Sequence, residues 1–263
     1  MTIPLIFDPN LLRTKRNIAA KNFNSFNFLH KYVAEGLIDR LDFTIRDFKK
    51  PLDFGVNGGE ICQLLNNSDN LIQASSVIEI LKAVQGNKVV IDEELIPFKN
   101  ESFDLIISNL LLQNLNDIPG CLVQLKNCLE KGGVFIASLM GGKTLFELRE
   151  VLVKTELELG IGSSPHVFPF ADVKDMGGLM QRAGFSFPVA DSEIITVSYP
   201  NIFKLIYDLR GMGTSNVLLQ RSKKYLGKRF FHLANEIYLE NYGNHHDEMT
   251  ASFEVITVTG IKI

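Results

Sequence analysis

Short apolar segments alternate with amphipathic ones through the middle of the chain. Apolar runs of strand length lie at residues 51–54, 70–73, 87–91, 103–108 and 134–138. Positions with helical spacing fill the intervals at about 58–66, 77–82 and 117–130. The run 103–108 is almost continuously apolar, as is typical of a parallel strand that is covered on both faces. This alternation predicts an α/β fold with a doubly wound, mostly parallel sheet.

The flanking segments are mainly helical by the same criterion. Helices are expected within 11–43, which holds two, and at 144–159, 171–183, 200–211 and 220–242, and two more strands are expected within 193–197 and at 253–263. The chain then reads as one domain, 1–263, with an N-terminal helical cap (1–45), a cofactor-binding half (46–140) and a helical insertion (199–245) before the last strand. Such a cap packs over a sheet edge or acts as a lid. Its basic residues Arg13, Lys15 and Arg16 are expected to form a solvated face, and contact with a carrier protein or a substrate is the alternative.

Composition narrows the function classes. The 263 residues are 46% hydrophobic, and the net charge of −3 argues against a protein that binds nucleic acid. The sequence contains no run of 18 apolar residues, so no transmembrane helix is predicted. The start of the chain lacks the pattern of a signal peptide, so a cytoplasmic protein is expected.

The cysteines and histidines give no sign of a metal or redox site. Cys62, Cys121 and Cys128 are not in C-x-x-C spacing, which indicates reduced thiols. His245 and His246 have no third ligand nearby in sequence, so no metal site is predicted. The oligomeric state is not predicted.

A glycine-bearing turn follows the first strand of the alternating region. It reads Gly55-Val-Asn57-Gly-Gly59 and leads into an amphipathic helix. Such a turn lets a ligand approach backbone N–H groups at a helix N-terminus. The same residues also suit an ordinary strand-to-helix connection. Asn57 stands where a cofactor turn has its central glycine. Asparagine tolerates a left-handed backbone, so the turn can survive, but its side chain points to where a ligand would approach.

Two later segments carry a resemblance to a known family. Asp92-Glu-Glu-Leu-Ile-Pro-Phe98 followed by Phe103-Asp-Leu-Ile-Ile-Ser108, and then Leu129-Glu-Lys-Gly-Gly-Val-Phe135, are similar to conserved segments of the class I S-adenosylmethionine (SAM) methyltransferases. Segments beyond residue 138 resemble one group within that class. This group contains a mitochondrial complex I assembly factor and is related to the malonyl-acyl-carrier-protein methyltransferase of biotin synthesis. The resemblance implies a seven-stranded Rossmann-like sheet and SAM as cofactor.

The resemblance also implies positions for the cofactor. The candidates are Asp53, Gly55, Asn57, Gly59, Ser75, Asp92, Glu93, Ser108 and Asn109. Asp53 matches the acid of the first strand, and Asp92 matches the acid that accepts from the adenine, with Glu93 beside it. Ser75 stands where the family has an acid that binds both ribose hydroxyls, and this loss predicts weakened binding. Glu79, one turn along the next predicted helix, is a remote candidate to replace this ribose-binding acid.

The catalytic residue is not predicted. Relatives often have His-Trp where this chain has Gln113 and Asn114, and glutamine cannot act as a general base near neutral pH. The substrate candidates are His166, Tyr199, Arg210 and Asn216, the last three expected in the helical insertion.

The resemblance implies methyl transfer from SAM to a carboxylate or a protein side chain, with an acyl-carrier protein or another protein as partner. The alternative is a degenerate methyltransferase-fold assembly factor for respiratory complex I that hydroxylates an arginine or binds a partner, with little SAM affinity.

Overall fold

The computed structural model describes residues 5–42, 46–66, 68–246 and 248–263. The helices are α1 (Pro9–Ala20), α2 (Phe28–Asp42), α3 (Glu60–Leu64), α4 (Ile78–Ala83), α5 (Ile118–Cys128), α6 (Phe146–Leu159), α7 (Val173–Arg182), α8 (Ile202–Gly211) and α9 (Gly227–Tyr242). The strands are β1 (Pro51–Phe54), β2 (Ile72–Ser75), β3 (Asn87–Val90), β4 (Phe103–Ser108), β5 (Leu129–Met140), β6 (Ser186–Tyr199) and β7 (Met249–Ile261). Single turns of 3₁₀ helix lie at Phe23–Ser25 (η1), Ser68–Asn70 (η2) and Leu112–Asn114 (η3).

The strands form one seven-stranded sheet in the order β3-β2-β1-β4-β5-β7-β6. The first five strands in this order are parallel to one another, and β7 is antiparallel to both of its neighbours. The order reverses between β1 and β4, and ligands of open α/β sheets bind outside the carboxyl ends of the strands at such a point. The predicted fold class is confirmed, including the helices inserted before the last strand.

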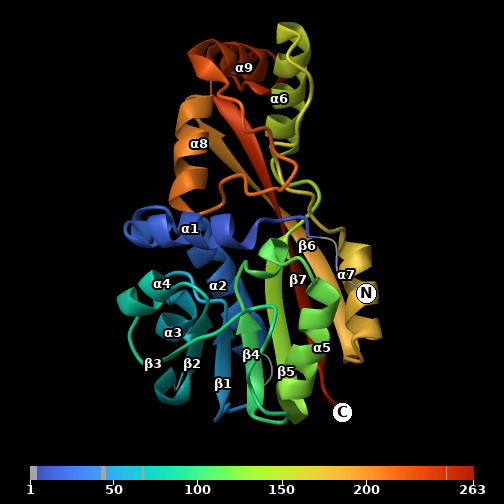
Figure 1. Cartoon of the computed structure of the whole chain (residues 1–263). Coiled ribbons are helices and arrows are strands. Elements are labelled where there is room, and N and C mark those ends of the chain that lie inside the picture. Colours follow the sequence, from blue (N-terminus) through green and yellow to red (C-terminus); the bar gives the residue numbers. More distant parts are fainter. Residues whose placement is uncertain (1–4, 43–45, 67, 247) are drawn as a thin grey trace.

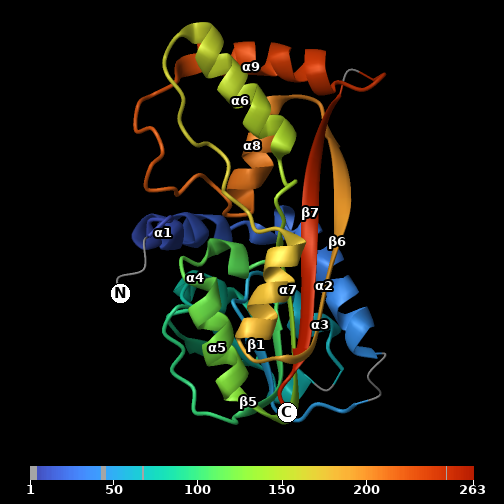
Figure 2. The same cartoon turned by 90° about the vertical axis from the view of Figure 1, so that its right-hand side faces the viewer.

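Helices cover both faces of the sheet (Figure 1). Leu29 and Leu37 of α2 and Ile61 of α3 pack in one core cluster with the β4 side chains Leu105 and Ile107. The opposite face of the sheet packs against α5 and α7 in a second cluster. Figure 2 shows α1 crossing the carboxyl end of the parallel strands. The parallel strands are therefore buried on both sides, and their carboxyl ends face the N-terminal helices.

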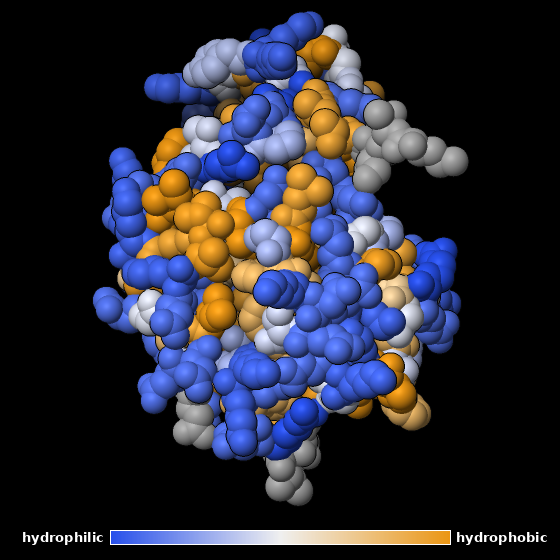
Figure 3. All heavy atoms as spheres, turned by 60° about the horizontal axis from the view of Figure 1, so that its bottom comes forward, coloured by the Kyte–Doolittle hydropathy of each residue, from blue (hydrophilic) through white to orange (hydrophobic). Residues whose placement is uncertain are grey.

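The long strands β6 and β7 extend beyond the other five and carry α8 and α9 at their far end, next to α6 (Figure 1). Tyr238 of α9 is completely buried, and its hydroxyl donates a hydrogen bond to the carbonyl of Thr250 in β7 at 2.9 Å. Helices α8 and α9 thus belong to the same packed body as the sheet. The opposite end of the molecule is shown in Figure 3, where hydrophilic side chains surround smaller apolar patches.

Element bounds differ from the predictions in both interior and edge strands. β5 begins at Leu129 rather than at residue 134, within the segment predicted to end a helix, and β7 begins at Met249 rather than at residue 253. β4 has its predicted bounds, whereas β2 begins and ends two residues later than expected. The prediction of strand six within 193–197 was too short, since β6 runs from Ser186 to Tyr199 and pairs along its length with β7. Few β6 residues are buried, so its sequence lacks a clear apolar period. α9 begins at Gly227 rather than at residue 220.

Candidate functional site

The turn after β1 has the backbone of a glycine turn. Gly55 and Gly59 adopt left-handed conformations with φ of +88° and +79°. Asn57 is not among the described non-glycine residues with positive φ, so the turn keeps its glycine geometry without a left-handed backbone at Asn57. The Gly58 N–H donates to the carboxylate of Glu60 at 3.0 Å. The turn therefore already holds a negatively charged group of its own chain at one N–H.

Asn57 and Asn109 connect this turn to the end of β4. The Asn57 side-chain amide donates to the carbonyl of Asn109 at 3.1 Å. The Asn109 side chain donates to the carbonyl of His30 at 2.9 Å and accepts from the Ser138 hydroxyl at 3.2 Å. Ser108 is completely buried, and its hydroxyl has no hydrogen-bond partner within the described ranges. Asn109 therefore joins β4, β5 and α2 where the sheet order reverses.

Asp53 lies beneath the turn in the middle of the sheet. Its side chain is 2% exposed. Burial, and secondarily the carboxylate of Glu60, raise the pKa of Asp53 well above its usual value. A carboxyl group in this environment favours its protonated form, which can donate a hydrogen bond.

The ends of β2 and β3 meet at a buried ion pair. The Glu93 carboxylate accepts from the Ser76 backbone N–H at 2.9 Å and contacts the Arg16 guanidinium at 3.0 Å. Burial raises the pKa of Glu93, but Arg16 and Ser76 together outweigh it, and the net shift is downward. The Ser75 hydroxyl accepts from the Val77 N–H at 3.2 Å. Arg16 is thus 6% exposed and paired, so its assignment to a solvated face was wrong.

Asp92, the predicted adenine-binding acid, remains exposed beside this pair. Its carboxylate accepts from the Glu94 backbone N–H at 2.9 Å, which stabilises the turn after β3. This contact leaves Asp92 accessible from solvent at the edge of the site.

A cavity of about 70 Å³ lies between the carboxyl end of β5, the η3 turn that follows β4, and the helices α6 and α8. Its walls are largely apolar, and its polar lining residues are His30, Gln113, Asn114, Thr144, His166 and Thr214. In the part of the chain that the structure describes, the buried Nδ1 of His30 and Oε1 of Gln113 have no hydrogen-bond partner. Buried polar atoms normally have partners, so both atoms suit a bound ligand. The volume has room for the tip of a side chain rather than for a whole cofactor.

His30 was not among the residues singled out from the sequence. Its ring stacks edge-on against Phe23, with ring centroids 4.9 Å apart. Burial, and secondarily the charge of Arg16, lower the pKa of His30 to about 3. His30 is therefore neutral at physiological pH. A single histidine on an amphipathic helix gives no signal in the sequence, because the fold alone brings His30 against the ends of β4 and β5.

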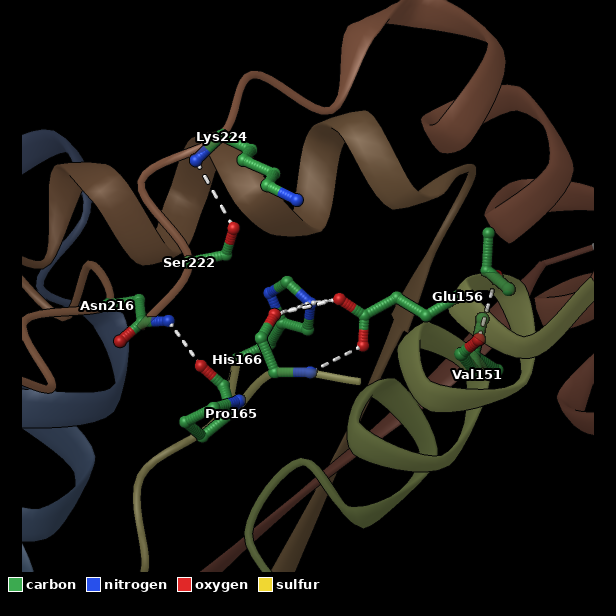
Figure 4. Close-up of polar contacts among 9 residues, drawn as sticks. Val151, Glu156, Pro165, His166, Asn216, Ser222 and Lys224 are labelled. Carbon is green, nitrogen blue, oxygen red and sulfur yellow. Dashed lines mark hydrogen bonds and ion pairs between the residues drawn. The ribbon is translucent and has the colours of Figure 1, made fainter. Parts of the chain in front are cut away.

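His166 is the predicted substrate residue that lines the cavity. Its Nε2 contacts the Glu156 carboxylate at 2.9 Å and the Ser164 hydroxyl at 3.2 Å. Glu156 also accepts from the Ser164 N–H and hydroxyl at 2.9 and 2.8 Å. Figure 4 shows the Glu156 side chain reaching from α6 to the loop that carries His166. This network fixes the position of one cavity wall.

The other three substrate candidates lie away from the cavity lining. Tyr199 ends β6 rather than belonging to an inserted helix; it is 3% exposed and its hydroxyl has no hydrogen-bond partner. Arg210 is exposed on α8. Asn216 follows α8 in a loop and donates to the carbonyl of Pro165 at 2.8 Å, as Figure 4 shows. The structure brings His166 alone of the four to the cavity.

The chemistry of these groups fits SAM. The left-handed turn, the buried Asp53 and the acids after β3 provide donors and acceptors for its polar parts. Space is more restricted. A pocket of about 240 Å³ lies beside Asn57 and Gly58 under the segment 20–25. Ligand pockets generally measure about 300–1,000 Å³, so a whole cofactor requires the N-terminal segment to shift.

Other kinds of site find less support. Within the described ranges, no group of three or more His, Cys, Asp or Glu side chains is placed to hold a metal ion. The helices in the described part of the chain do not combine the length and apolar character that crossing a bilayer requires. Cys62, Cys121 and Cys128 are free thiols, as predicted.

Comparisons with known proteins identify the family of this chain. A family model described as a methyltransferase domain matches residues 26–187. The human protein named arginine-hydroxylase NDUFAF5, mitochondrial, is 37% identical over 98% of this chain and 77% of its own length. A malonyl-[acyl-carrier protein] O-methyltransferase from Coxiella burnetii is 29% identical over 95% of this chain and 86% of its own. The crystal structure of YcgJ from Bacillus subtilis shares the fold, with a TM-score of 0.61 and 13% identity over 88% of this chain and 98% of its own. The chain therefore belongs to the methyltransferase domain family, which confirms the enzyme class and the SAM cofactor predicted from the sequence.

Proposed function

We propose that the protein transfers a methyl group from SAM to a carboxylate or a protein side chain held in the cavity beside β4 and β5. The observation that carries this proposal is the pair of unpartnered buried atoms, His30 Nδ1 and Gln113 Oε1, in an otherwise apolar cavity at the carboxyl end of the sheet. When bound, SAM supplies an electrophilic methyl group. The chain's own contribution is to position the acceptor and to exclude water.

The lining residues suit a small polar group at the end of a larger substrate. Gln113 Oε1 can accept from an N–H or O–H group of the substrate, while its amide nitrogen is engaged with the Leu110 carbonyl at 2.7 Å. His30 Nδ1 can donate or accept according to its tautomer, so it can complement either a carboxylate or a protonated group. The neutral ring has a pKa of about 3 and is therefore a weak base, so positioning is its proposed role.

The parts of the chain divide this work. In the proposal, residues 46–140 hold the cofactor through Asp53, the turn at 55–59 and the acids after β3. The N-terminal cap, 1–45, and the insertion, 199–245, enclose the acceptor. An acyl-carrier protein carrying a carboxylate, or another protein, is the proposed partner, since the Coxiella relative is named for such a carrier. Cytoplasmic action is part of the same proposal.

Calorimetry and a transfer assay test this function. We expect SAM and S-adenosylhomocysteine (SAH) to bind with micromolar dissociation constants. Radiolabelled SAM should then transfer label to malonyl-acyl-carrier protein or to a protein acceptor, and Gln113→Leu should reduce transfer while leaving SAH affinity unchanged. An absence of heat with millimolar SAH for the wild type, for Asn57→Gly and for Arg16→Met, which removes the cation paired with Glu93, would refute the methyltransferase proposal.

The second candidate is assembly of respiratory complex I, with arginine hydroxylation or partner binding as the activity. It is favoured by the 37% identity to human NDUFAF5, which extends over 98% of this chain. Mass spectrometry of complex I subunits from cells with and without this protein distinguishes the candidates. A 16 Da increase on an arginine that depends on the protein supports hydroxylation, and unmodified arginines in both samples exclude it.

A further inference from the structure

The missing ribose-binding acid of β2 has a spatial replacement. Ser75, the last residue of β2, stands at the position of that acid, and its hydroxyl already accepts a hydrogen bond from the Val77 N–H. The carboxylate of Glu93 reaches this place from the end of β3, because it accepts from the N–H of Ser76, the residue that follows β2, at 2.9 Å. A carboxylate is therefore present at the end of β2 although the β2 sequence has none.

Arg16 of α1 holds this carboxylate. The Arg16 Nη1 lies 3.0 Å from Glu93 Oε1, and the two side chains are 6% and 8% exposed. Arg16 Nη2, also buried, has no hydrogen-bond partner among the described residues. Two of the five N–H donors of the guanidinium are therefore unsatisfied, and burying them carries a desolvation cost that offsets part of the attraction between Arg16 and Glu93.

We propose that Glu93 is the ribose-binding acid of this protein, and that the ribose hydroxyls of SAM and the guanidinium of Arg16 compete for its carboxylate. This inference rests on the proposed function. Occupation of the site then requires the Arg16 side chain to turn away, which couples cofactor binding to the position of α1 over the carboxyl end of the sheet (Figure 2). No covalent step is involved.

Glu79 is the natural comparison, since it is also a carboxylate close to β2. It lies on α4 and forms an exposed pair with Lys82 at 2.9 Å, with side chains 46% and 66% exposed respectively. Exposed ion pairs of this kind contribute little to the stability of the folded protein. Glu79 therefore points to solvent rather than to the end of β2, and Glu79→Gln is a matched control for the loss of one negative charge.

Titration calorimetry with SAH on the full chain tests the inference through binding rather than turnover. Glu93→Gln should weaken SAH binding by about tenfold to a hundredfold, the range of one or two hydrogen bonds to a charged group. Arg16→Met should tighten binding by up to about tenfold because the competing cation is gone. Ser75→Asp in the Glu93→Gln background should recover much of the loss, and Glu79→Gln should bind like the wild type.

Folding is checked separately, because removing one member of a buried ion pair destabilises a protein. The double variant Arg16→Met with Glu93→Gln removes both charges and should remain folded by circular dichroism, yet bind SAH as weakly as Glu93→Gln alone. The inference is overturned if Glu93→Gln binds SAH like the wild type, or if Arg16→Met loses as much affinity as Glu93→Gln.

The wild type itself separates the two proposals. If the wild type fails to bind SAH while Arg16→Met binds it, competition by Arg16 is supported and the cofactor assignment stands. If the wild type, Arg16→Met and Ser75→Asp all fail to bind at millimolar SAH, the cofactor assignment and this inference fall together. Normal SAH binding by every variant removes the role of Glu93 alone and leaves the proposed function intact.

Discussion

His30 gives the stability of the protein a specific dependence on pH. In the folded protein its pKa is lowered from 6.5 to about 3, first by burial and then by the charge of Arg16. In the unfolded chain the ring regains its ordinary pKa of about 6.5. Between these two values the unfolded chain binds a proton that the folded protein does not, so stability falls as the pH is lowered.

The size of the effect follows from these pKa values. At pH 5.0 the unfolded histidine is almost fully protonated, about 1.5 pH units below its pKa, and the folded one is almost fully neutral. At about 1.4 kcal/mol per unit, His30 should remove roughly 2 kcal/mol of unfolding free energy between pH 7.5 and pH 5.0.

Urea unfolding at 25 °C measures this contribution. His30→Gln lowers stability at both pH values but should show a smaller decrease from pH 7.5 to pH 5.0 than the wild type, by about 2 kcal/mol. Comparing the two proteins cancels the titration of the other groups. The exposed His232 is the control, and His232→Gln should keep the wild-type decrease. Equal decreases in wild type and His30→Gln would refute the assignment of a neutral, buried ring.

Two further predictions concern the walls of the site. Gly55→Ala should destabilise the protein by about 2–5 kcal/mol, because its φ is +88° and a new Cβ would lie 2.2 Å from Leu111. The control is Gly36→Ala in α2, where a new Cβ would meet no described atom within 4 Å apart from the local backbone, and this change should stabilise the protein by about 1 kcal/mol. Similar melting temperatures for the two variants would contradict this reasoning. Glu156→Ala should lower the free energy of unfolding by about 1–3 kcal/mol, because it removes the carboxylate that holds His166 and its loop. Backbone hydrogen exchange in residues 160–168 should accelerate, and unchanged exchange there would count against the network.

Local patterns were sufficient for the central strand β4. β4 was predicted with its observed bounds because it is buried on both faces, and four of its six residues, Phe103, Leu105, Ile106 and Ile107, are apolar. Asp117 caps α5 through the Gly120 N–H at 2.8 Å, as expected of a residue before a proline-containing first turn. The edge strand β6 was underestimated, because its side chains are mostly part-exposed and its length depends on β7, more than 50 residues later in the chain.

Charges and single polar side chains were harder to predict. Arg16 belongs to a segment whose sequence predicts a basic, solvated face. In the structure Arg16 is buried, because Glu93 lies against α1 and pairs with it. Asn57 was expected to rely on a left-handed backbone, whereas its side chain instead bonds the carbonyl of Asn109, 52 residues away. His30 carried no signal at all.

The sequence by itself determined the fold class, the glycine turn, the family and the absence of an acid at Ser75, because apolar periodicity and short motifs are local properties of the chain. The tertiary structure decided which side chains meet at the carboxyl end of the sheet. It placed Glu93 at the end of β2, buried Arg16 against it, and set His30 and His166 around one cavity. These contacts depend on how α1, α2 and α6 pack over the strands, and packing between distant segments is not encoded in any single stretch of sequence.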